Sequence, residues 1–440
     1  MPSSPPGFSS LTTASACNWA DVKYQNRVLG GLSLLAIITY LDRVCISVAG
    51  PRMQEDLHIS PEAWGWVTGV FALSYGLFEI PTGAMGDRIG ARKVLTRIVA
   101  WWSAFTALTG TVSNYFLLLL VRFLFGMGEA GAYPNAATVI ARWFPVKRRA
   151  RAWGIVWMSS QIGGAISPLL VVPIQSHFGW RASFFVFCAL GLGWAAAWYA
   201  WFRDSPAEMP GVSEAERMEL ADTGTRAGHA MPWGLALRSG NLWMLMGICI
   251  CYVYALYFFQ SWFHTYLVKG RGFHESDLWL SSLPYIVGAC ANCTGGFASD
   301  WLVGRFGLKT GRRIVGLVGL GAAALFMLAT MLTTSDTWAL VFLSLVYGGM
   351  TLQQPNVSAV ALDIGTGHAG AVLGFANTAA QAGSFASSVA FGYLVKNYGS
   401  YSAPFVPMVV MLLIGVVLWS RIDPTRGIFM QADHAVGVKS

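Results

Sequence analysis

Charged residues are scarce in this sequence. Asp, Glu, Lys and Arg make up 11% of the 440 residues, while 55% of the residues are hydrophobic. A soluble domain uses about 25% charged and about 45–50% apolar residues, so the composition excludes an ordinary set of soluble domains. Because the apolar excess is spread over the whole chain, it indicates a protein that lies in a lipid bilayer.

Signatures of catalysis and metal binding are also missing. The patterns G-x-S-x-G and H-E-x-x-H and the phosphate-binding loop do not occur, and the seven histidines show no metal spacing. Cys249-x-Cys251 and Cys290-x-x-Cys293 have no His or carboxylate beside them to complete a tetrahedral zinc site. We therefore expect small buried thiols at helix contacts, and neither an enzyme, nor a metal site, nor a cofactor.

Two further absences narrow the class of membrane protein. Apolar runs such as Leu117–Leu120 and Leu340–Val346 do not alternate in polarity, which excludes a transmembrane β-barrel. The first residues lack a charged start that is followed directly by a short apolar stretch and a cleavage site. We therefore expect no removable signal peptide, and a helical membrane protein remains.

Apolar stretches long enough to cross a bilayer recur along the chain. A hydrocarbon core of about 30 Å requires about 20 apolar residues per helical span. Twelve stretches meet that length: 28–50, 64–85, 93–112, 115–141, 152–173, 180–202, 241–266, 278–300, 313–332, 336–361, 369–395 and 403–421. The aromatic residues Trp64, Trp66, Trp101 and Trp102 are expected in belts at the membrane interfaces.

The positions of Lys and Arg predict the orientation. If the N-terminus is cytoplasmic, the cytoplasmic segments hold 22 of the 29 basic residues and the outer segments hold five. Positive residues concentrate on the cytoplasmic side of membrane proteins, so both termini are expected there. The net charge of +8 is then a topology signal, and it does not indicate a nucleic-acid partner.

The chain divides into two similar halves. Gly83–Arg88 is echoed by Gly295–Trp301, Tyr133-Pro134-Asn135 by Gln354-Pro355-Asn356, and Ser160-Gln161 by Ala380-Gln381, at nearly one offset. Duplicated halves are the usual build of secondary transporters. The expected segments are an N-terminal stretch (1–27), a six-helix bundle (28–202), a central loop (203–240), a second bundle (241–421) and a tail (422–440). Within the loop, Ser213-x-x-Glu216 predicts a short helix with a capping box.

Five ionisable residues fall inside the predicted spans: Asp42, Arg43, Glu79, Arg122 and Glu129. A charge at the centre of a bilayer costs about 2.5–3.5 kcal/mol on insertion scales, so such residues face a cavity or a partner. Arg122 and Glu129 are seven residues apart, which is about 10 Å along a helix and too far for a direct ion pair. Each of them needs another partner.

The helical positions separate their roles. Asp42 and Arg43 are neighbours, so their side chains diverge by about 100° around the helix. Tyr40 and Arg43 share a side and are assigned to a central cavity, while Asp42 points toward a neighbouring helix. Glu79, just before Pro81, is assigned to a gate or to the structure around the loop, and Tyr75 either lines the cavity or packs in the core.

The second half does not repeat these charges. The offset places Leu343 opposite Arg122 and Met350 opposite Glu129. The second half offers neutral hydrogen-bonding groups instead: Tyr252, Tyr254, Tyr257, Gln353, Gln354, Asn356, Asn377 and Gln381. An anion with a polar tail would suit such a cavity.

Several motifs resemble a known family. The segment Gly83-x-x-Gly86-Asp87-Arg88-x-Gly90-x-Arg92-Lys93 resembles the signature loop of the major facilitator superfamily. Tyr40-Leu41-Asp42-Arg43, Arg122-x-x-x-Gly126-x-x-Glu129-Ala130-Gly131-Ala132-Tyr133-Pro134 and Tyr257-Phe258-Phe259-x-x-Trp262 are similar to its anion:cation symporter branch. The resemblance implies an all-α membrane protein with the major facilitator fold, twelve transmembrane helices in two six-helix bundles and both termini cytoplasmic.

The resemblance also implies a function. Members of this branch carry organic anions such as galactonate, glucarate, tartrate, hexuronates or phthalate, and bacterial members resemble proton symporters. Glu79 stands where many members have glutamine, and Tyr133-Pro134-Asn135 is one of several variants, so the particular anion is not carried over. We expect a monomer in the plasma membrane, which for a bacterial protein is the inner membrane. Its expected partners are a small organic anion, protons and lipid.

The residues receive three roles in this hypothesis. The predicted substrate-binding residues are Tyr40, Arg43, Tyr75, Arg122, Tyr133, Gln161, Tyr254, Asn356 and Asn377. The predicted proton carriers are Asp42 and Glu129. The predicted gating or structural residues are Glu79, Asp87, Arg88, Arg92, Asp300 and Arg312, which would join the two halves on the cytoplasmic side. The alternatives are a static ion pair for Arg122 and Glu129, a packing role for Asp42, an exporter of the same fold, and a receptor that does not transport.

Overall fold

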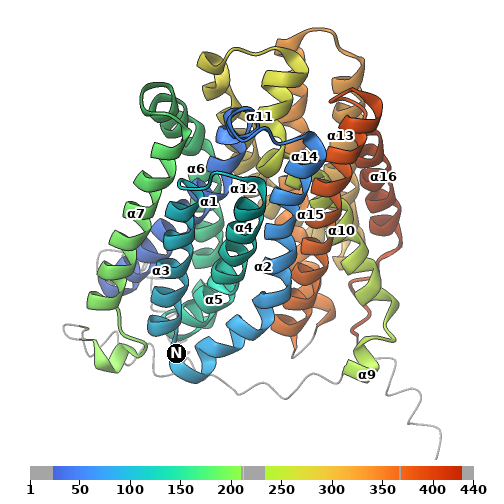
Figure 1. Cartoon of the computed structure of the whole chain (residues 1–440). Coiled ribbons are helices and arrows are strands. Elements are labelled where there is room, and N and C mark those ends of the chain that lie inside the picture. Colours follow the sequence, from blue (N-terminus) through green and yellow to red (C-terminus); the bar gives the residue numbers. More distant parts are fainter. Residues whose placement is uncertain (1–22, 210–211, 213–232, 366–367, 429–440) are drawn as a thin grey trace, which may run out of the picture.

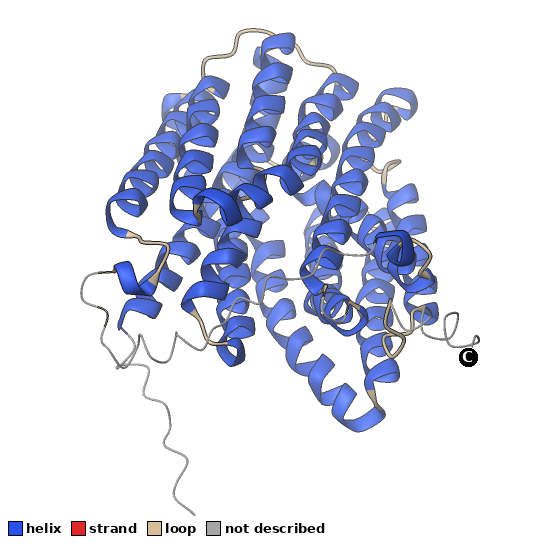
Figure 2. Cartoon of the chain, turned by 90° about the horizontal axis from the view of Figure 1, so that it is seen from below, coloured by secondary structure: helices blue, strands red, loops and turns tan. Residues whose placement is uncertain are grey.

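The computed structural model describes residues 23–209, 212, 233–365 and 368–428, and the regular secondary structure of these residues is helical (Figures 1 and 2). The first half contains α1 (Lys23–Asp56), α2 (Pro61–Ile89), α3 (Ala91–Thr109), α4 (Tyr115–Glu129), α5 (Ala132–Trp143), α6 (Val146–Phe178) and α7 (Trp180–Trp201). Two short helices, η2 (Pro206–Glu208) and α9 (Trp233–Ala236), lie in the expected central loop. The predicted helix at Ser213 lies outside the described residues.

The second half repeats this plan with a more broken first span. It contains α10 (Gly240–Ser261), α11 (Phe263–Thr265), η3 (Tyr266–Gly270), η4 (Glu275–Ser282), α12 (Leu283–Phe306), α13 (Leu308–Leu332), α14 (Asp336–Ile364), α15 (Ala369–Tyr398) and α16 (Phe405–Arg421). Each of the twelve predicted stretches coincides with one of these helices or with consecutive ones, and the all-helical class is confirmed.

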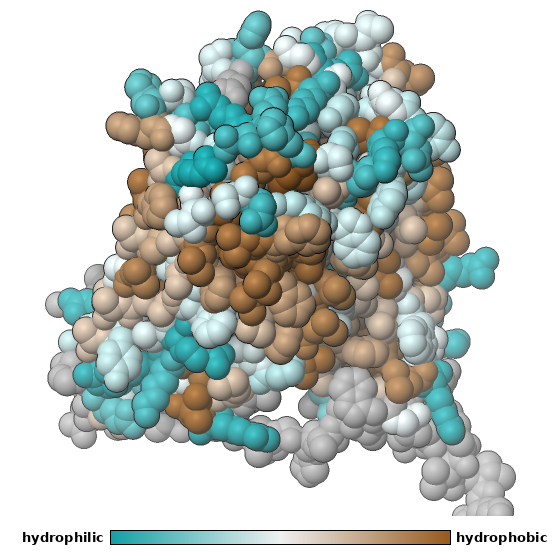
Figure 3. Space-filling model, viewed as in Figure 1, coloured by the Kyte–Doolittle hydropathy of each residue, from teal (hydrophilic) through white to brown (hydrophobic). Residues whose placement is uncertain are grey.

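Helices long and apolar enough to cross a membrane are present among the described residues. Six segments meet both criteria: Tyr24–Asp56, Tyr115–Trp143, Arg151–Phe178, Trp180–Trp201, Gly240–Ser261 and Leu308–Leu332. Figure 3 shows a hydrophobic band around the middle of the molecule, with hydrophilic residues above and below it. Such a band matches the apolar core of a bilayer between its two polar interfaces.

Local signals set the helix ends. The Ser60 side chain accepts a hydrogen bond from the Ala63 N–H, with Pro61 in the first turn of α2, and Asn114 caps α4 in the same way through Leu117. Such capping side chains satisfy N–H groups that a helix leaves unpaired. Gly90 joins α2 to α3 with a φ of 89°, a conformation that glycine adopts without strain.

The helices pack in two groups. Helices α1 to α7 contact one another, as do α10 to α16, and the N-terminal group lies toward the left of Figure 1. We call these the N-terminal and C-terminal bundles. The main contacts between the bundles join α2 to α15, α6 to η4 and α12, and α1 to α10 and α11.

Close backbone approach tightens the upper part of this interface, at the top of Figure 1, where α1 ends and α2 begins. A Cβ added at Gly65 would lie 2.7 Å from the Ser388 carbonyl oxygen, and one at Gly392 would lie 2.4 Å from the Pro61 carbonyl oxygen. The glycines let α2 and α15 touch without side chains between them. The two bundles are therefore sealed together on this side.

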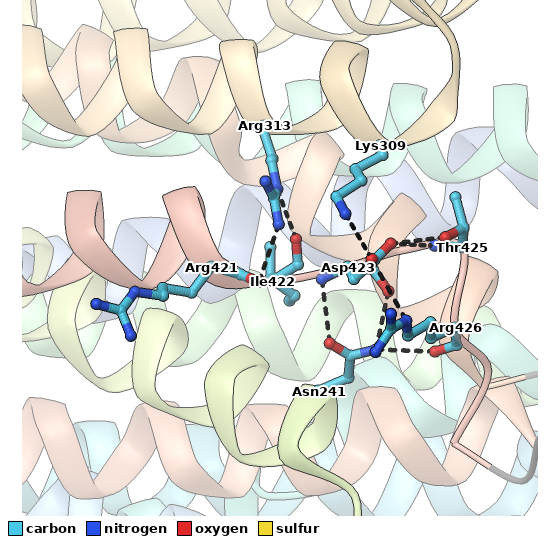
Figure 4. A network of polar contacts seen from close by, with 8 residues as sticks. All are labelled: Asn241, Lys309, Arg313, Arg421, Ile422, Asp423, Thr425 and Arg426. Atoms are coloured by element: carbon cyan, nitrogen blue, oxygen red, sulfur yellow. Dashed lines mark hydrogen bonds and ion pairs between the residues drawn. The ribbon is translucent and has the colours of Figure 1, made fainter. Parts of the chain in front are cut away.

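The segment after α16 is fastened to the lower ends of α10 and α13 (Figure 4). The Asn241 side chain donates to the backbone oxygens of Asp423 and Arg426, and Lys309 forms an ion pair with Asp423 at 2.8 Å. Partial burial opposes ionisation, but the hydrogen bonds from Lys309 and Thr425 outweigh it and lower the pKa of Asp423 to about 2.

Two predictions of local structure were wrong. Trp64 and Trp102 are fully buried between helices, whereas Trp66 and Trp101 are exposed. Cys290 and Cys293 are exposed, although Cys249 and Cys251 are buried. The predicted span 115–141 matches a segment long and apolar enough to cross a membrane, but the helix breaks between α4 and α5.

Candidate functional site

The break between α4 and α5 positions Glu129. Glu129 is the last residue of α4, and Gly131 follows with a φ of 88°. A Cβ on Gly131 would lie 2.7 Å from Thr82, so both the backbone conformation and the space require glycine here. The Asn135 side chain donates to the carbonyl oxygens of Gly131 and Thr82, so it holds the break against α2.

Glu129 forms an ion pair with Arg43 of α1. The Arg43 Nε donates to Glu129 Oε1 at 2.6 Å, and the Glu129 side chain is 1% exposed. Within the described residues, neither Arg43 Nη2 nor Glu129 Oε2 has a hydrogen-bond partner. A buried charge-assisted hydrogen bond is strong, yet each partner keeps one unused polar atom.

Aromatic rings surround the Arg43 guanidinium. Its central carbon lies 4.8 Å from the centre of the Tyr75 ring, 5.5 Å from Phe71 and 5.9 Å from Tyr40. The faces of aromatic rings attract a cation and exclude water. Tyr40 and Tyr75 therefore both lie beside Arg43.

Arg122 also packs against Phe71. Its guanidinium carbon is 4.8 Å from the Phe71 ring centre and 4.7 Å from the Phe125 ring centre. The charges of Glu129 and Asp42 act on Arg122, but no carboxylate pairs directly with it in the described part of the chain, and its Nε lacks a hydrogen-bond partner there. A buried guanidinium without a direct ion pair is costly in energy, so this position suits an incoming anion.

Asp42 points away from Arg43, as the helix geometry predicted. The indole of Trp102 on α3 lies beside the Asp42 carboxylate. The side chain is 3% exposed, and neither of its oxygens has a hydrogen-bond partner among residues that the structure describes. An ionised carboxylate without partners is expensive at this depth, so Asp42 is a candidate to bind a proton.

Polar side chains of α5 and α6 extend the cluster toward the C-terminal bundle. The Tyr133 hydroxyl and Ser160 Oγ form a hydrogen bond of 2.9 Å. Tyr133 also stacks on Trp157, with ring centres 4.9 Å apart. The residue that follows Ser160, Gln161, accepts a hydrogen bond from the Tyr347 hydroxyl of α14 at 3.0 Å, so it joins the two bundles.

Glu79 and Asn377 form a second polar contact between the bundles. The Asn377 Nδ2 of α15 donates to Glu79 Oε1 of α2 at 2.5 Å. Glu79 is 4% exposed, and its charge is close enough to Arg43 and Tyr75 to influence both. The structure therefore brings Glu79 into the same region as the predicted substrate-binding residues.

Two predicted substrate-binding residues lie elsewhere. The Asn356 side chain accepts a hydrogen bond from Ser299 and donates one to the Arg312 backbone oxygen, so its amide joins α12, α13 and α14. Tyr254 is buried in the hydrophobic cluster that includes most of α10. Neither residue contacts the Arg43 group in this conformation.

Apart from Glu79, the predicted gating residues whose contacts the structure describes stay within their own bundles in this conformation. Arg92 donates through its backbone and side chain to Asp204 and to the Tyr199 carbonyl. Arg312 pairs with Asp363 at 3.1 Å and with Asp300 at 3.6 Å. Arg88 is exposed at the end of α2, and the Asp87 side chain lies outside the described part.

A buried histidine that the sequence did not single out seals the upper side. The Ser281 hydroxyl donates to the Leu278 carbonyl, so it accepts from His264 Nε2 at 2.7 Å. His264 Nδ1 then accepts from Ser47 of α1 at 2.9 Å. His264 therefore links α1 to the C-terminal bundle as a neutral ring. Only the three-dimensional contact reveals this role, because neither serine is near it in sequence.

The arrangement can bind a proton and an anion in one place. Arg43 and Arg122 offer guanidinium donors, while Asp42, Glu79 and Glu129 offer carboxylates that accept protons. Most of these groups have an unused polar atom. The cluster lies between two bundles, which are sealed on one side by the glycine contacts and by His264. It fits a site that alternates between two faces of a membrane.

Comparisons with known proteins agree with this architecture. The sequence profile of the Major Facilitator Superfamily matches residues 32–388. The chain is 33% identical over 409 residues to the probable sulfoacetate transporter SauU of Cupriavidus necator, an alignment that covers 92% of this chain and 95% of the relative. It is 30% identical to the hexuronate transporter of Bacillus subtilis, with 85% and 89% covered.

The fold also has solved counterparts. A bacterial homologue of the human lysosomal transporter Spinster, in an inward-facing and occupied conformation, superposes with a TM-score of 0.74. The identity is 21%, and the match covers 91% of this chain and 97% of that one. At this identity the likeness concerns the fold alone.

Proposed function

Because the chain belongs to the major facilitator superfamily, and is therefore a multi-pass membrane transporter rather than an enzyme, we propose that it takes up a small organic anion together with protons by alternating access. The observation that carries this proposal is the buried Arg43–Glu129 pair, in which both partners keep one unused polar atom. The relatives named for sulfoacetate and hexuronate support a carboxylate or sulfonate as the anion.

Arg43 and Arg122 would seat the anion. A guanidinium offers a planar set of donors and stays charged in a low dielectric. Phe71 contacts both guanidiniums, so the two charges lie close enough together to act on one small anion. Tyr40, Tyr75, Tyr133, Gln161 and Asn377 add neutral hydrogen-bonding groups around it. Tyr254 and Asn356 would join only in another conformation.

Glu129 and Asp42 would carry protons. In the empty site, Glu129 accepts a hydrogen bond from Arg43 and is stabilised as a carboxylate. When a substrate anion takes over Arg43, Glu129 loses its counter-charge and binds a proton more readily. The proton and the anion are then loaded together, and neither is favoured alone.

The bundles would rock about the loaded site. The excess of Lys and Arg supports a cytoplasmic location for the lower side of Figure 1, where α1 begins and α16 ends. The seal around His264 would then face outward, and the chamber would open toward the cytoplasm. In the opposite conformation, the ends of α2 and α12 would approach each other on the cytoplasmic side. This contact between the two bundles (residues 28–202 and 241–421) would be stabilised by Asp87, Arg88, Arg92, Asp300 and Arg312. A single chain contains the whole site, which favours a monomer.

Uptake into sealed proteoliposomes tests the proposal. An inward proton gradient should drive accumulation of at least one labelled acid from a panel of sugar acids, dicarboxylates and sulfonates, and an uncoupler should abolish it. Arg122→Lys keeps the charge but loses the planar donors, so it serves as the matched variant and should lose most uptake. Accumulation driven by an outward proton gradient would indicate an exporter, and binding without flux would indicate a receptor. Either result overturns the proposal.

A further inference from the structure

The contact between α2 and α15 extends down to Glu79. From its upper end downward, it includes the Glu62–Lys396 ion pair, the approach of Gly65 and Thr68 to Ser388, and the packing of Gly76 against Gln381. The hydrogen bond from Asn377 to Glu79 comes next. Asn377 itself is exposed, although it faces α2. Glu79 therefore lies on the contact between the two bundles, at the depth of Arg43.

Glu79 has an unused oxygen at this point. Its Oε1 accepts from Asn377, while Oε2 is buried and has no hydrogen-bond partner among the described residues. The charged and titratable groups that influence it are Arg43 from α1 and Tyr75 on its own helix, and α15 contributes the neutral Asn377. Arg43 is already paired with Glu129. Glu79 therefore has no counter-charge of its own.

The charges of the buried cluster do not balance. Asp42, Glu79 and Glu129 are three carboxylates, whereas Arg43 and Arg122 are two guanidiniums. With every group ionised, the cluster holds one excess negative charge before any anion enters. A bound anion adds at least one more. Two protons, on Asp42 and Glu129, restore neutrality only for a monoanion, so a dianion requires a third carboxylate that takes up a proton.

We propose that Glu79 is a third proton-carrying residue, which adds one proton to each transport cycle and lets the site accept a dianion. This inference rests on the proposed proton symport. The ionised carboxylate accepts from Asn377 Nδ2. After a proton from water adds to it, the carboxylic acid donates to Asn377 Oδ1 once the amide turns over. Because Asn377 can serve both forms, the contact between the bundles survives the change of charge.

The number of coupled protons tests this role. The measurement is the inside-to-outside concentration ratio of the anion at which net flux stops, with the membrane potential clamped at zero. For a pH difference of one unit, each coupled proton raises this ratio tenfold. Glu79→Gln keeps the size and the acceptor for Asn377 but cannot titrate. We expect this variant to transport, with a ratio that is tenfold smaller than in the wild type at a difference of one pH unit. An unchanged ratio overturns the inference while leaving proton symport intact.

Asn377→Ala is the matched control. It removes the hydrogen bond between Asn377 and Glu79 but leaves the Glu79 carboxylate. This variant should therefore transport more slowly, with an unchanged concentration ratio at zero net flux. If Glu79 has only a structural role, both variants leave the ratio unchanged. If the wild-type protein exchanges the anion but never accumulates it in a pH gradient, the proposed symport itself fails, and this inference fails with it.

A second readout covers the case in which Glu79→Gln is inactive. Infrared difference spectra of the purified protein with and without the transported anion should contain a protonated carboxyl band from Glu79. Glu79→Asp keeps a titratable group, so it should retain a band of changed frequency and also the wild-type reversal ratio. A carboxyl spectrum that is identical in this variant and in the wild type would overturn the inference.

Discussion

Arg43 donates to Glu129 across 86 residues of sequence, from the middle of α1 to the last residue of α4. The pair fixes α1 against the break between α4 and α5. Because Glu129 lies at the C-terminal end of a helix, where a negative charge is disfavoured, its ionised form depends on Arg43. Any anion that competes for Arg43 therefore changes how readily Glu129 binds a proton.

Glu129→Gln should separate exchange from accumulation. Glutamine can still accept a hydrogen bond from Arg43 Nε, so the site should keep its shape and its affinity for the anion. It cannot carry a proton, so the variant should exchange labelled for unlabelled anion at a rate near that of the wild type. Accumulation in a pH gradient should fall to the equilibration level. Normal accumulation in the proteoliposome assay would remove Glu129 from the proton pathway.

Arg43→Ala should lower both stability and transport. Removing one partner leaves the Glu129 carboxylate buried without a counter-charge, which costs about 3–5 kcal/mol, and thermal unfolding in detergent should occur at a lower temperature. The double variant Arg43→Ala/Glu129→Ala should recover most of that stability but no uptake. Recovery of uptake in the double variant would show that the pair is a static structural element.

Gly131→Ala tests the break between α4 and α5. Alanine at a φ of 88° costs about 1–2 kcal/mol, and its Cβ would meet Thr82 at 2.7 Å. Glu129 should shift away from Arg43, so uptake should fall at least tenfold. Gly154→Ala is the matched control, since a Cβ there meets nothing within 4 Å, and its uptake should be unchanged. Equal uptake by the two variants would contradict the role of the break.

The sequence predicted the helices and the buried charges well, because both follow from local rules. Apolar length identified the spans, and the insertion cost of a charge identified Arg43, Arg122 and Glu129. The partner of each charge was not predictable, because the Arg43–Glu129 contact depends on how the other helices of the bundle place α1 relative to the end of α4. His264 was missed for the same reason, since its two serine partners lie 217 and 17 residues away.

The polar residues of the second half show the limit of the duplication argument. Asn377 and Asn356 both looked like neutral ligands for an anion, yet Asn377 faces Glu79 while Asn356 joins three helices of its own bundle. A shared offset predicts that two residues lie at corresponding depths. It does not predict which face of the helix meets the chamber.

His264→Ala should weaken the seal on the upper side. The change removes the hydrogen bonds to Ser47 and Ser281, each worth about 0.5–1.5 kcal/mol, so the outward-open population should rise about 5- to 100-fold. Thr265 lies in this seal, where its side chain accepts a hydrogen bond from Gln54. A cysteine introduced there (Thr265→Cys) would react faster with an impermeant maleimide when the seal opens. Because Cys290 and Cys293 are exposed, both are first replaced by serine. Unchanged labelling would show that other contacts hold the seal.

Acid should release the segment after α16. The pKa of Asp423 is about 2 in the folded protein and about 3.9 in an unfolded chain, so ionisation stabilises the attachment to Lys309 and Asn241. Since the folded value is the lower one, this contribution is fully present above about pH 4 and is lost as the pH falls toward 2. Proteolysis of the tail by pepsin should therefore accelerate steeply over that range. Asp423→Asn has no carboxylate to protonate at this position, so cleavage of this variant should already be fast at pH 4 and should change little below it. An unfolded reference peptide measures how pepsin's own activity changes with pH, and the cleavage rates are corrected for that change. An equally steep acceleration in this variant would show that another group holds the segment.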